Sequence, residues 1–169
     1  MVNYTIGIDF GYHENLAFVL YHEESRSFGK SYIIDLSGSK TLHLKKRSKK
    51  FYGEIIGKIA SIARKLSLDA IDAEKITILP ERQLSYDLIL LQGLVTGVLV
   101  HFFSRFEPKV KMLRNMDACK HFSIPVAKKV IATSLKKQKT MDLVKKLTGL
   151  PTINEHESDA MLLVLYYHK

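Results

Sequence analysis

The sequence has 169 residues, of which 46% are hydrophobic, and its formal net charge is +9. A chain of this size has room for one hydrophobic core, so we expect residues 1–169 to form a single domain. The lone cysteine, Cys119, excludes an intramolecular disulfide and a cysteine-rich zinc site, and it indicates a reducing compartment such as the cytoplasm. The excess of Lys and Arg favours a polyanionic partner.

The first elements of the chain are expected to be strands. Residues 4–9 and 15–21 are rich in β-forming side chains and are separated by a turn, so they predict a hairpin. A third strand is expected at Ser31–Leu36. Apolar residues then recur with helical spacing from Phe51 to Leu66, and a short buried strand follows at Lys75–Leu79.

The longest apolar stretch, Leu84–Phe106, predicts a long helix. It carries Asp87, His101 and Arg105, so we interpret it as a buried helix and not as a membrane span. No membrane partner is therefore expected. A fifth strand is predicted at Lys109–Leu113.

Helices are expected to complete the chain. Asp117 is predicted to be the N-cap of a short helix that ends at Phe122. After a basic loop, a helix at Met141–Leu147 should end at Gly149, and a last helix should span Asn154–Tyr167. This order of elements is typical of the RNase H-like fold, an α/β layout with a mixed five-stranded sheet, three antiparallel strands first and helices on both faces.

Two segments are dense in basic residues. One is the loop-like stretch 37–50, and the other lies at 128–139, around the loop predicted before the helix at 141. Such runs are often only a solvated face of a protein, and the alternative is contact with a phosphate backbone. The candidates for nucleic-acid contact, with Tyr86 as a ring for base stacking, are Lys45, Lys46, Arg47, Lys49, Lys50, Lys128, Lys129, Lys136, Lys137 and Lys139.

Four residues could carry chemistry. Asp9 lies in an apolar strand that should be central in the sheet, where an ionised carboxylate without a counter-charge is costly. Glu81 follows the next buried strand, at the edge where open sheets present their sites. His156 and Asp159 are three residues apart and share one face of the last helix, with Glu155 as a reserve ligand. Hard oxygen donors with one imidazole predict Mg²⁺ or Mn²⁺ and not zinc.

Each of these residues also has an ordinary structural interpretation. Asp9 alone could be an acid at the start of a loop, and Glu81 alone could be a helix N-terminal residue stabilised by the helix dipole. His156 alone could be a surface or capping residue. The joint occurrence of the four, in this order and on these elements, favours a metal site.

The sequence resembles a known family in three blocks. They are Gly-Ile-Asp-Phe-Gly at 7–11, Glu81 ahead of a long helix, and the segment 150–160, where four residues separate Leu-Pro from His-Glu-Ser-Asp-Ala. Their order and spacing resemble the RuvC family of Holliday junction resolvases, including phage and poxvirus members, over nearly the whole chain. The position three residues after Glu81, often aromatic in that family, is Leu84 here.

The resemblance implies a structure-specific DNA endonuclease that resolves four-way junctions by paired symmetric nicks and leaves 5′-phosphate products. It implies two Mg²⁺ or Mn²⁺ ions per active site, and a homodimer formed through the helix Leu84–Phe106. It also implies action at the nucleoid or at a viral or phage replication site. The metal-binding and catalytic residues that it implies are Asp9, Glu81, His156 and Asp159, with Lys137 or Lys128 as a lysine near the scissile phosphate.

Three other functions stay open at this point. The first is a monomeric nuclease of the same fold that acts on RNA or on other branched DNA, and the second is a junction-binding protein without catalysis. The third is an actin-like or sugar-kinase ATPase, whose chain also opens with an acidic residue before a hairpin. The short length and the lack of a phosphate-binding glycine motif argue against the third.

Overall fold

The computed structural model describes residues 2–11, 15–36, 49–125, 130–150 and 153–169, without the side chains of residues 49–52 and 130–133. Lys45, Lys46, Arg47, Lys128 and Lys129 lie outside the described residues, and so do the side chains of Lys49 and Lys50. The proposed contacts of these residues with DNA stay predictions.

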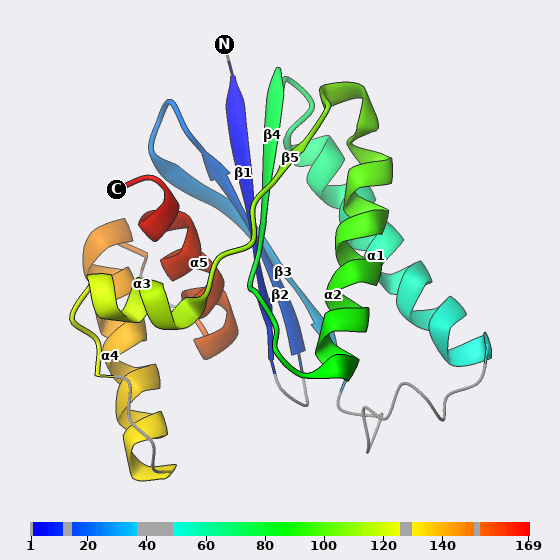
Figure 1. Ribbon diagram of the computed structural model, residues 1–169. Coiled ribbons are helices and arrows are strands. Elements are labelled where there is room, and N and C mark those ends of the chain that lie inside the picture. Colours follow the sequence, from blue (N-terminus) through cyan, green and yellow to red (C-terminus); the bar gives the residue numbers. More distant parts are fainter. Residues whose placement is uncertain (1, 12–14, 37–48, 126–129, 151–152) are drawn as a thin grey trace.

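A mixed five-stranded sheet forms the centre of the molecule (Figure 1). β1 is antiparallel to β2 and parallel to β4, and β2 is antiparallel to β3. The predicted RNase H-like sheet, with its three antiparallel strands first, is confirmed. The strands, in the spatial order β3-β2-β1-β4-β5, are β1 (Asn3–Phe10), β2 (Asn15–His22), β3 (Ser27–Asp35), β4 (Lys75–Pro80) and β5 (Lys109–Val110).

Helices cover both faces of the sheet, as predicted (Figure 1). α1 (Lys49–Asp69) and α2 (Tyr86–Phe102) lie on one face, and α3 (Asn115–His121), α4 (Val130–Thr148) and α5 (Glu155–Tyr167) lie on the other. Among the described residues, no helix is both long and apolar enough to cross a membrane.

Strand β1 is buried on both faces and separates two cores. Because side chains alternate along a strand, Ile6 and Ile8 enter the core that contains α1 and α2. Gly7 faces α5 instead, and a Cβ atom on Gly7 would lie 2.6 Å from Val164 Cγ2 and 2.8 Å from the carbonyl oxygen of Ala160. The absence of a side chain at Gly7 therefore allows α5 to approach the strand closely.

Several predicted boundaries were wrong. β3 begins at Ser27 and not at Ser31, because antiparallel pairing with β2 extends it into a polar, exposed stretch that gives no hydrophobic signal. α2 ends at Phe102, and a short 3₁₀ turn, η2 (Ser104–Phe106), follows it. β5 has two residues, and Leu113 makes only an isolated bridge to Glu81.

The helices after β5 also differ from the prediction. Arg114 and not Asp117 is the N-cap of α3, and Asp117 lies in the first turn, where it pairs with Arg114 at 2.8 Å. α4 begins at Val130, eleven residues before the predicted start at Met141, so Lys136, Lys137 and Lys139 are helical and not in a loop. Long straight side chains favour the helix at these positions although they give no apolar period. Gly149 ends α4 with a φ of 72°, as predicted.

The substitution Gly7→Ala tests the close approach of α5. The added methyl group would meet a backbone oxygen, so we expect the free energy of unfolding to fall by about 1–3 kcal/mol in urea titrations. Gly57→Ala is the matched control, because Gly57 is exposed on α1 and nothing lies within 4 Å of an added Cβ. The control should raise the free energy of unfolding by roughly 0.5–1 kcal/mol. Equal effects of the two substitutions would contradict this account of Gly7.

Candidate active site

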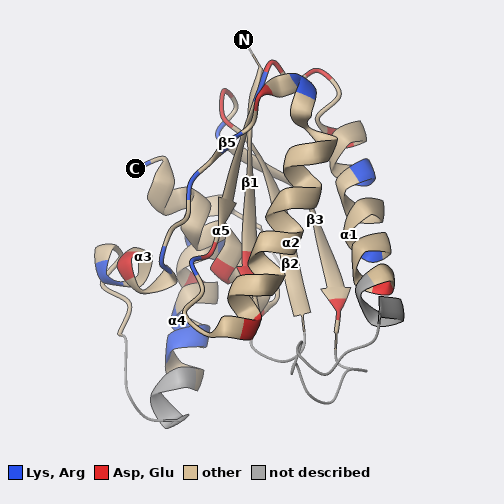
Figure 2. Cartoon of the chain, turned by 45° about the vertical axis from the view of Figure 1, so that its right-hand side comes forward, with Lys and Arg blue, Asp and Glu red and all other residues tan. Residues whose placement is uncertain are grey.

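The candidate site lies where β1 and β4 end and α5 begins. Asp9 is on the face of β1 that packs against α5, and its side chain is 6% exposed. Glu81 follows β4 directly, and its backbone N–H donates to the carbonyl of Ile8 at 2.9 Å, which fixes it beside β1. Acidic segments of β1 and α5 lie together in the middle of the molecule (Figure 2).

His156 contacts Asp9 directly. Its Nδ1 lies 3.0 Å from Asp9 Oδ2, and its side chain is 16% exposed. This hydrogen bond is the largest cause of a raised pKa of His156. A Cβ atom on Gly11 would lie 2.5 Å from His156 Cε1, so the glycine after Phe10 leaves the space that the imidazole occupies. Gly7 and Gly11 therefore both allow α5 to lie close to β1.

The start of α5 is fixed by a capping box. The side chain of Asn154 accepts from the backbone N–H of Glu157 at 2.8 Å, and the Glu157 carboxylate accepts from the backbone N–H of Asn154 at 2.9 Å. Glu157 also accepts a hydrogen bond from Ser31 on β3. These bonds hold Glu157 away from Asp9 and set the rotation of α5 that turns His156 and Asp159 toward the sheet.

Burial and mutual repulsion perturb the acids. Burial, followed by the charges of Asp9 and Asp159, raises the pKa of Glu81 to about 8, although the hydrogen bond from Gln83 acts in the opposite direction. Burial, followed by the charge of Asp9, raises the pKa of Asp159 to about 6, although Lys136, Asn115 and His156 act in the opposite direction. Three carboxyl groups therefore share a poorly solvated space with less positive charge than their ionised forms need.

The donor set fits hard divalent cations. Carboxylate oxygens with one imidazole are ligands that Mg²⁺ and Mn²⁺ accept, and a bound cation would offset the repulsion among the acids. As they stand, the described side chains form no group of three or more His, Cys, Asp or Glu residues arranged to hold a metal ion. They are hydrogen bonded to each other and to neighbours instead, His156 to Asp9 and Glu81 to Gln83. The role of these residues as metal ligands stays a prediction.

Lysines of α4 reach the rim of the site. Lys137 Nζ lies 2.7 Å from Glu155 Oε2, and Glu155 Oε1 lies 3.5 Å from His156 Nε2. The reserve ligand Glu155 is thus paired with a lysine. Lys136 is half-buried and acts on Asp159 through its charge. Lys139 is exposed on the same helix.

Sequence reasoning missed two amide side chains beside the acids. Gln83 Nε2 donates to Glu81 Oε2 at 2.9 Å. Asn115 is buried at the start of α3, interacts with Asp159 and accepts a hydrogen bond from Cys119 Sγ at 3.2 Å. A single amide has no periodic signal, so nothing in the sequence pattern identified either residue.

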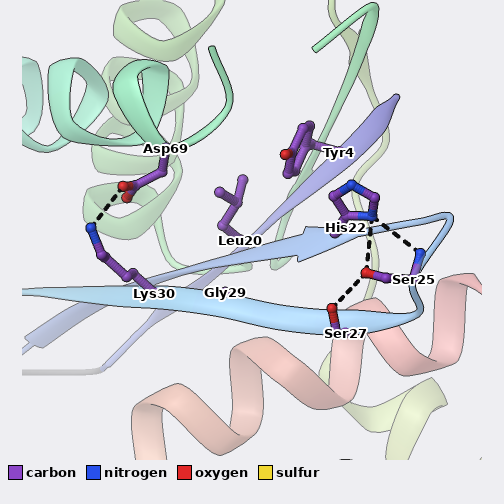
Figure 3. A pocket seen from close by; sticks show the side chains of 8 residues that line it. All are labelled: Tyr4, Leu20, His22, Ser25, Ser27, Gly29, Lys30 and Asp69. Atoms are coloured by element: carbon purple, nitrogen blue, oxygen red, sulfur yellow. Dashed lines mark hydrogen bonds and ion pairs between the residues drawn. The ribbon is translucent and has the colours of Figure 1, made fainter. Parts of the chain in front are cut away.

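A pocket of about 270 Å³ lies away from these acids, at the opposite end of β1 and on the face that carries α1 (Figure 3). Its polar groups satisfy one another: His22 accepts from the backbone N–H of Ser25 at 3.1 Å, and Lys30 pairs with Asp69 at 3.0 Å. We assign no ligand to it. The residues that line it are Tyr4, Leu20, His22, Ser25, Ser27, Gly29, Lys30 and Asp69.

The sheet, the helices on both faces and the acids at the strand ends define an α/β protein of the RNase H-like class. The chain has the fold of RuvC of T. thermophilus solved with a Holliday junction substrate, with a TM-score of 0.60 and 15% identity over 96% of this chain and 90% of that chain. The Thermus thermophilus RuvC structure matches with a TM-score of 0.58 and 15% identity over 96% and 91% of the two chains.

The yeast mitochondrial Holliday junction resolvase Ydc2 is a third similar structure. Its TM-score is 0.52 at 12% identity, over 97% of this chain and 77% of that chain. No protein-family model and no curated protein matches the sequence. The resemblance to a RuvC-like resolvase, first drawn from short motifs, therefore extends to the fold of nearly the whole chain.

The dependence of stability on pH tests the crowding of the acids. Because the pKa of Glu81 is about 8 in the folded protein and 4.5 ordinarily, the folded state holds a proton that the unfolded state has lost between these values. In EDTA we therefore expect the melting temperature to fall as the pH rises from 5 to 8. Mn²⁺ should raise it more at pH 8 than at pH 5, since ligands bind as carboxylates.

Glu81→Gln is the control for this experiment, because it removes the titrating group and keeps the size of the side chain. The fall in melting temperature with pH should become shallower in this variant. An identical pH profile for the variant and the wild-type protein would show that Glu81 is not the source of the effect.

Proposed function

We propose that this protein is a metal-dependent endonuclease that cuts four-way DNA junctions. The observation that carries the proposal is the convergence of Asp9, Glu81, Asp159 and His156 at the carboxyl ends of β1 and β4. Two similar structures support the choice of substrate, because one is a RuvC bound to a Holliday junction and one is a mitochondrial Holliday junction resolvase. The net charge of +9 suits binding to a phosphate backbone.

In the proposed mechanism, Asp9, Glu81, Asp159 and His156 would hold two Mg²⁺ or Mn²⁺ ions. Bound ions of this kind lower the pKa of a coordinated water and stabilise the charge that develops on phosphate oxygens. The carboxylates that would bind the ions come from β1, from the residue after β4 and from α5. Hydrolysis forms a bond from the water oxygen to phosphorus and breaks the bond to the 3′-oxygen, which takes up a proton. The products are a 5′-phosphate and a 3′-hydroxyl.

The lysines of α4 have a separate role in this proposal. Lys137 is the proposed catalytic lysine, and its ion pair with Glu155 holds its ammonium group at the rim of the acid cluster. The charge of Lys136 opposes the rise in the pKa of Asp159, which favours the ionised form that a cation needs. Exposed Lys139 would contact the DNA backbone farther from the cleavage point.

Cleavage assays test this function with labelled four-way junctions, flaps, linear DNA duplexes and RNA duplexes in Mg²⁺. We expect paired nicks in the four-way junction only, with 5′-phosphate ends. Asp9→Asn and Asp159→Asn should bind the junction but cut it at least about 100-fold more slowly, the size of effect expected for groups that act on the transition state.

Glu54→Gln is the matched control, because Glu54 is exposed on α1 and its neutralisation should leave cutting unchanged. Equal cutting of flaps or RNA would favour a nuclease of broader substrate range. Junction binding without cutting by the wild-type protein in Mg²⁺ or Mn²⁺ would mean that the protein is not an endonuclease.

We also propose that the protein acts as a homodimer through α2. The face of α2 away from the core carries exposed Ile89 and Leu90, at 47% and 42%, with Tyr86 one turn before them. Gly93 and Gly97 continue this row, are exposed, and have nothing within 4 Å of an added Cβ. Mid-helix glycines are unfavourable, but they let a second helix approach closely. A two-fold dimer would present two active sites to a junction that has the same symmetry.

The substitution Leu90→Asp tests the dimer. A buried carboxylate on each side of a two-fold interface is strongly unfavourable, so we expect a monomer in sedimentation velocity and a loss of paired nicks. Leu135→Asp is the matched control, since Leu135 is 50% exposed on α4, on the other side of the sheet. It should leave the sedimentation coefficient unchanged. A wild-type protein that sediments as a monomer would contradict the proposed dimer.

A further inference from the structure

The segment that leads from Glu81 to α2 is anchored by three successive backbone N–H groups. The backbone N–H of Glu81 donates to Ile8, and the backbone N–H of Arg82 donates to the carbonyl of Leu113 at 2.7 Å. The next N–H, that of Gln83, donates to the side-chain oxygen of Gln92 at 3.2 Å. A side chain of α2 therefore holds the backbone of the segment one residue before Leu84.

Gln92 is an unusual residue for its place. It is 4% exposed and lies on the core side of α2 with Leu88, Leu91 and Val95. Its Nε2 is buried and has no hydrogen-bond partner among the described residues. An unsatisfied buried donor costs about 1–3 kcal/mol, whereas an apolar side chain of the same size would carry no such cost. A glutamine at position 92 therefore lowers the stability of the fold, which indicates that its side chain has a role other than packing.

Gln83 connects this buried amide to the acid cluster. While Gln92 fixes the backbone of Gln83, the Gln83 side chain turns back and donates to Glu81 Oε2 at 2.9 Å. One carboxylate oxygen of Glu81 is thereby held, and the carboxyl group also interacts with Asp9. The hydrogen bond from Gln83 therefore restricts the rotation of the Glu81 carboxyl group at the end of β4.

We propose that Gln83 and Gln92 form a positioning pair that orients Glu81 to bind a divalent cation. This inference rests on the proposed metal-dependent function. Neither amide is a catalytic residue in this scheme, because Gln83 acts through Glu81 and Gln92 acts through Gln83. Partners that orient a metal ligand typically change metal affinity or activity by about 10–100-fold when they are removed.

The test measures binding of Mn²⁺ alone to the full chain, by the electron paramagnetic resonance signal of free Mn²⁺ and by calorimetry. We expect Gln83→Met and Gln92→Met each to weaken Mn²⁺ binding by roughly 10-fold. Gln92→Met should leave the melting temperature in EDTA nearly unchanged, because it removes the unsatisfied donor together with the acceptor for the Gln83 N–H. A residue that served packing alone would show the opposite combination, a lower melting temperature with unchanged Mn²⁺ affinity.

Gln138→Met is the matched control, since Gln138 is exposed on α4 and bonds only to Asp142 at 2.8 Å among the described residues. It should bind Mn²⁺ like the wild-type protein. If the wild-type protein binds Mn²⁺ and both test variants bind it equally well, the proposal that Gln83 and Gln92 position Glu81 is wrong, whereas the proposed function stands. If the wild-type protein binds no Mn²⁺, the metal site itself is wrong. If Gln92→Met unfolds, Gln83→Met alone decides the question.

Discussion

The close contact between α5 and β1 is the constraint on which the site depends. Gly7 in the central strand β1 and Gly11 just after it carry no side chain, and an added Cβ at either would collide with α5. The helix therefore lies near enough for His156 Nδ1 to reach Asp9 Oδ2 at 3.0 Å. Asp159, one turn further along α5, then comes within electrostatic reach of Asp9 and Glu81. A helix displaced outward by a methyl group would separate the acids that come from different elements.

That contact brings together groups that oppose folding. Buried carboxyl groups lose hydration, and each ionised one raises the cost of ionising the next. The surrounding structure offsets this cost with apolar packing, because β1 is buried on both faces and α5 contributes Met161, Leu162 and Val164 to the second core. His156 and Lys136 supply only part of the balancing charge. The proposed metal ions would supply the positive charge that the cluster still lacks.

The sequence predicted what depends on local pattern and missed what depends on tertiary contacts. Strands β1, β2 and β4 have strong apolar patterns, and the acid positions could be deduced because parallel strand ends meet at one edge of a sheet. The start of α4 was missed because a lysine-rich stretch gives no apolar period, and Asp117 was misplaced because an acid in the first turn of a helix resembles an N-cap. Gln83 and Asn115 act only through partners that folding brings to them.

Helix α2 contributes both to the proposed dimer contact and to the position of Glu81 in the site. Its outward face carries Leu90 and Gly93, the proposed dimer contact, and its inward face carries Gln92, which holds the segment that bears Glu81. Because Gln92 is part of α2, a partner helix that packed against α2 would also restrain the acceptor for the Gln83 N–H. In the proposed dimer, each subunit would then stabilise the metal ligand of the other without contributing a residue to its site. Paired cutting would follow from the two-fold relation between the two sites.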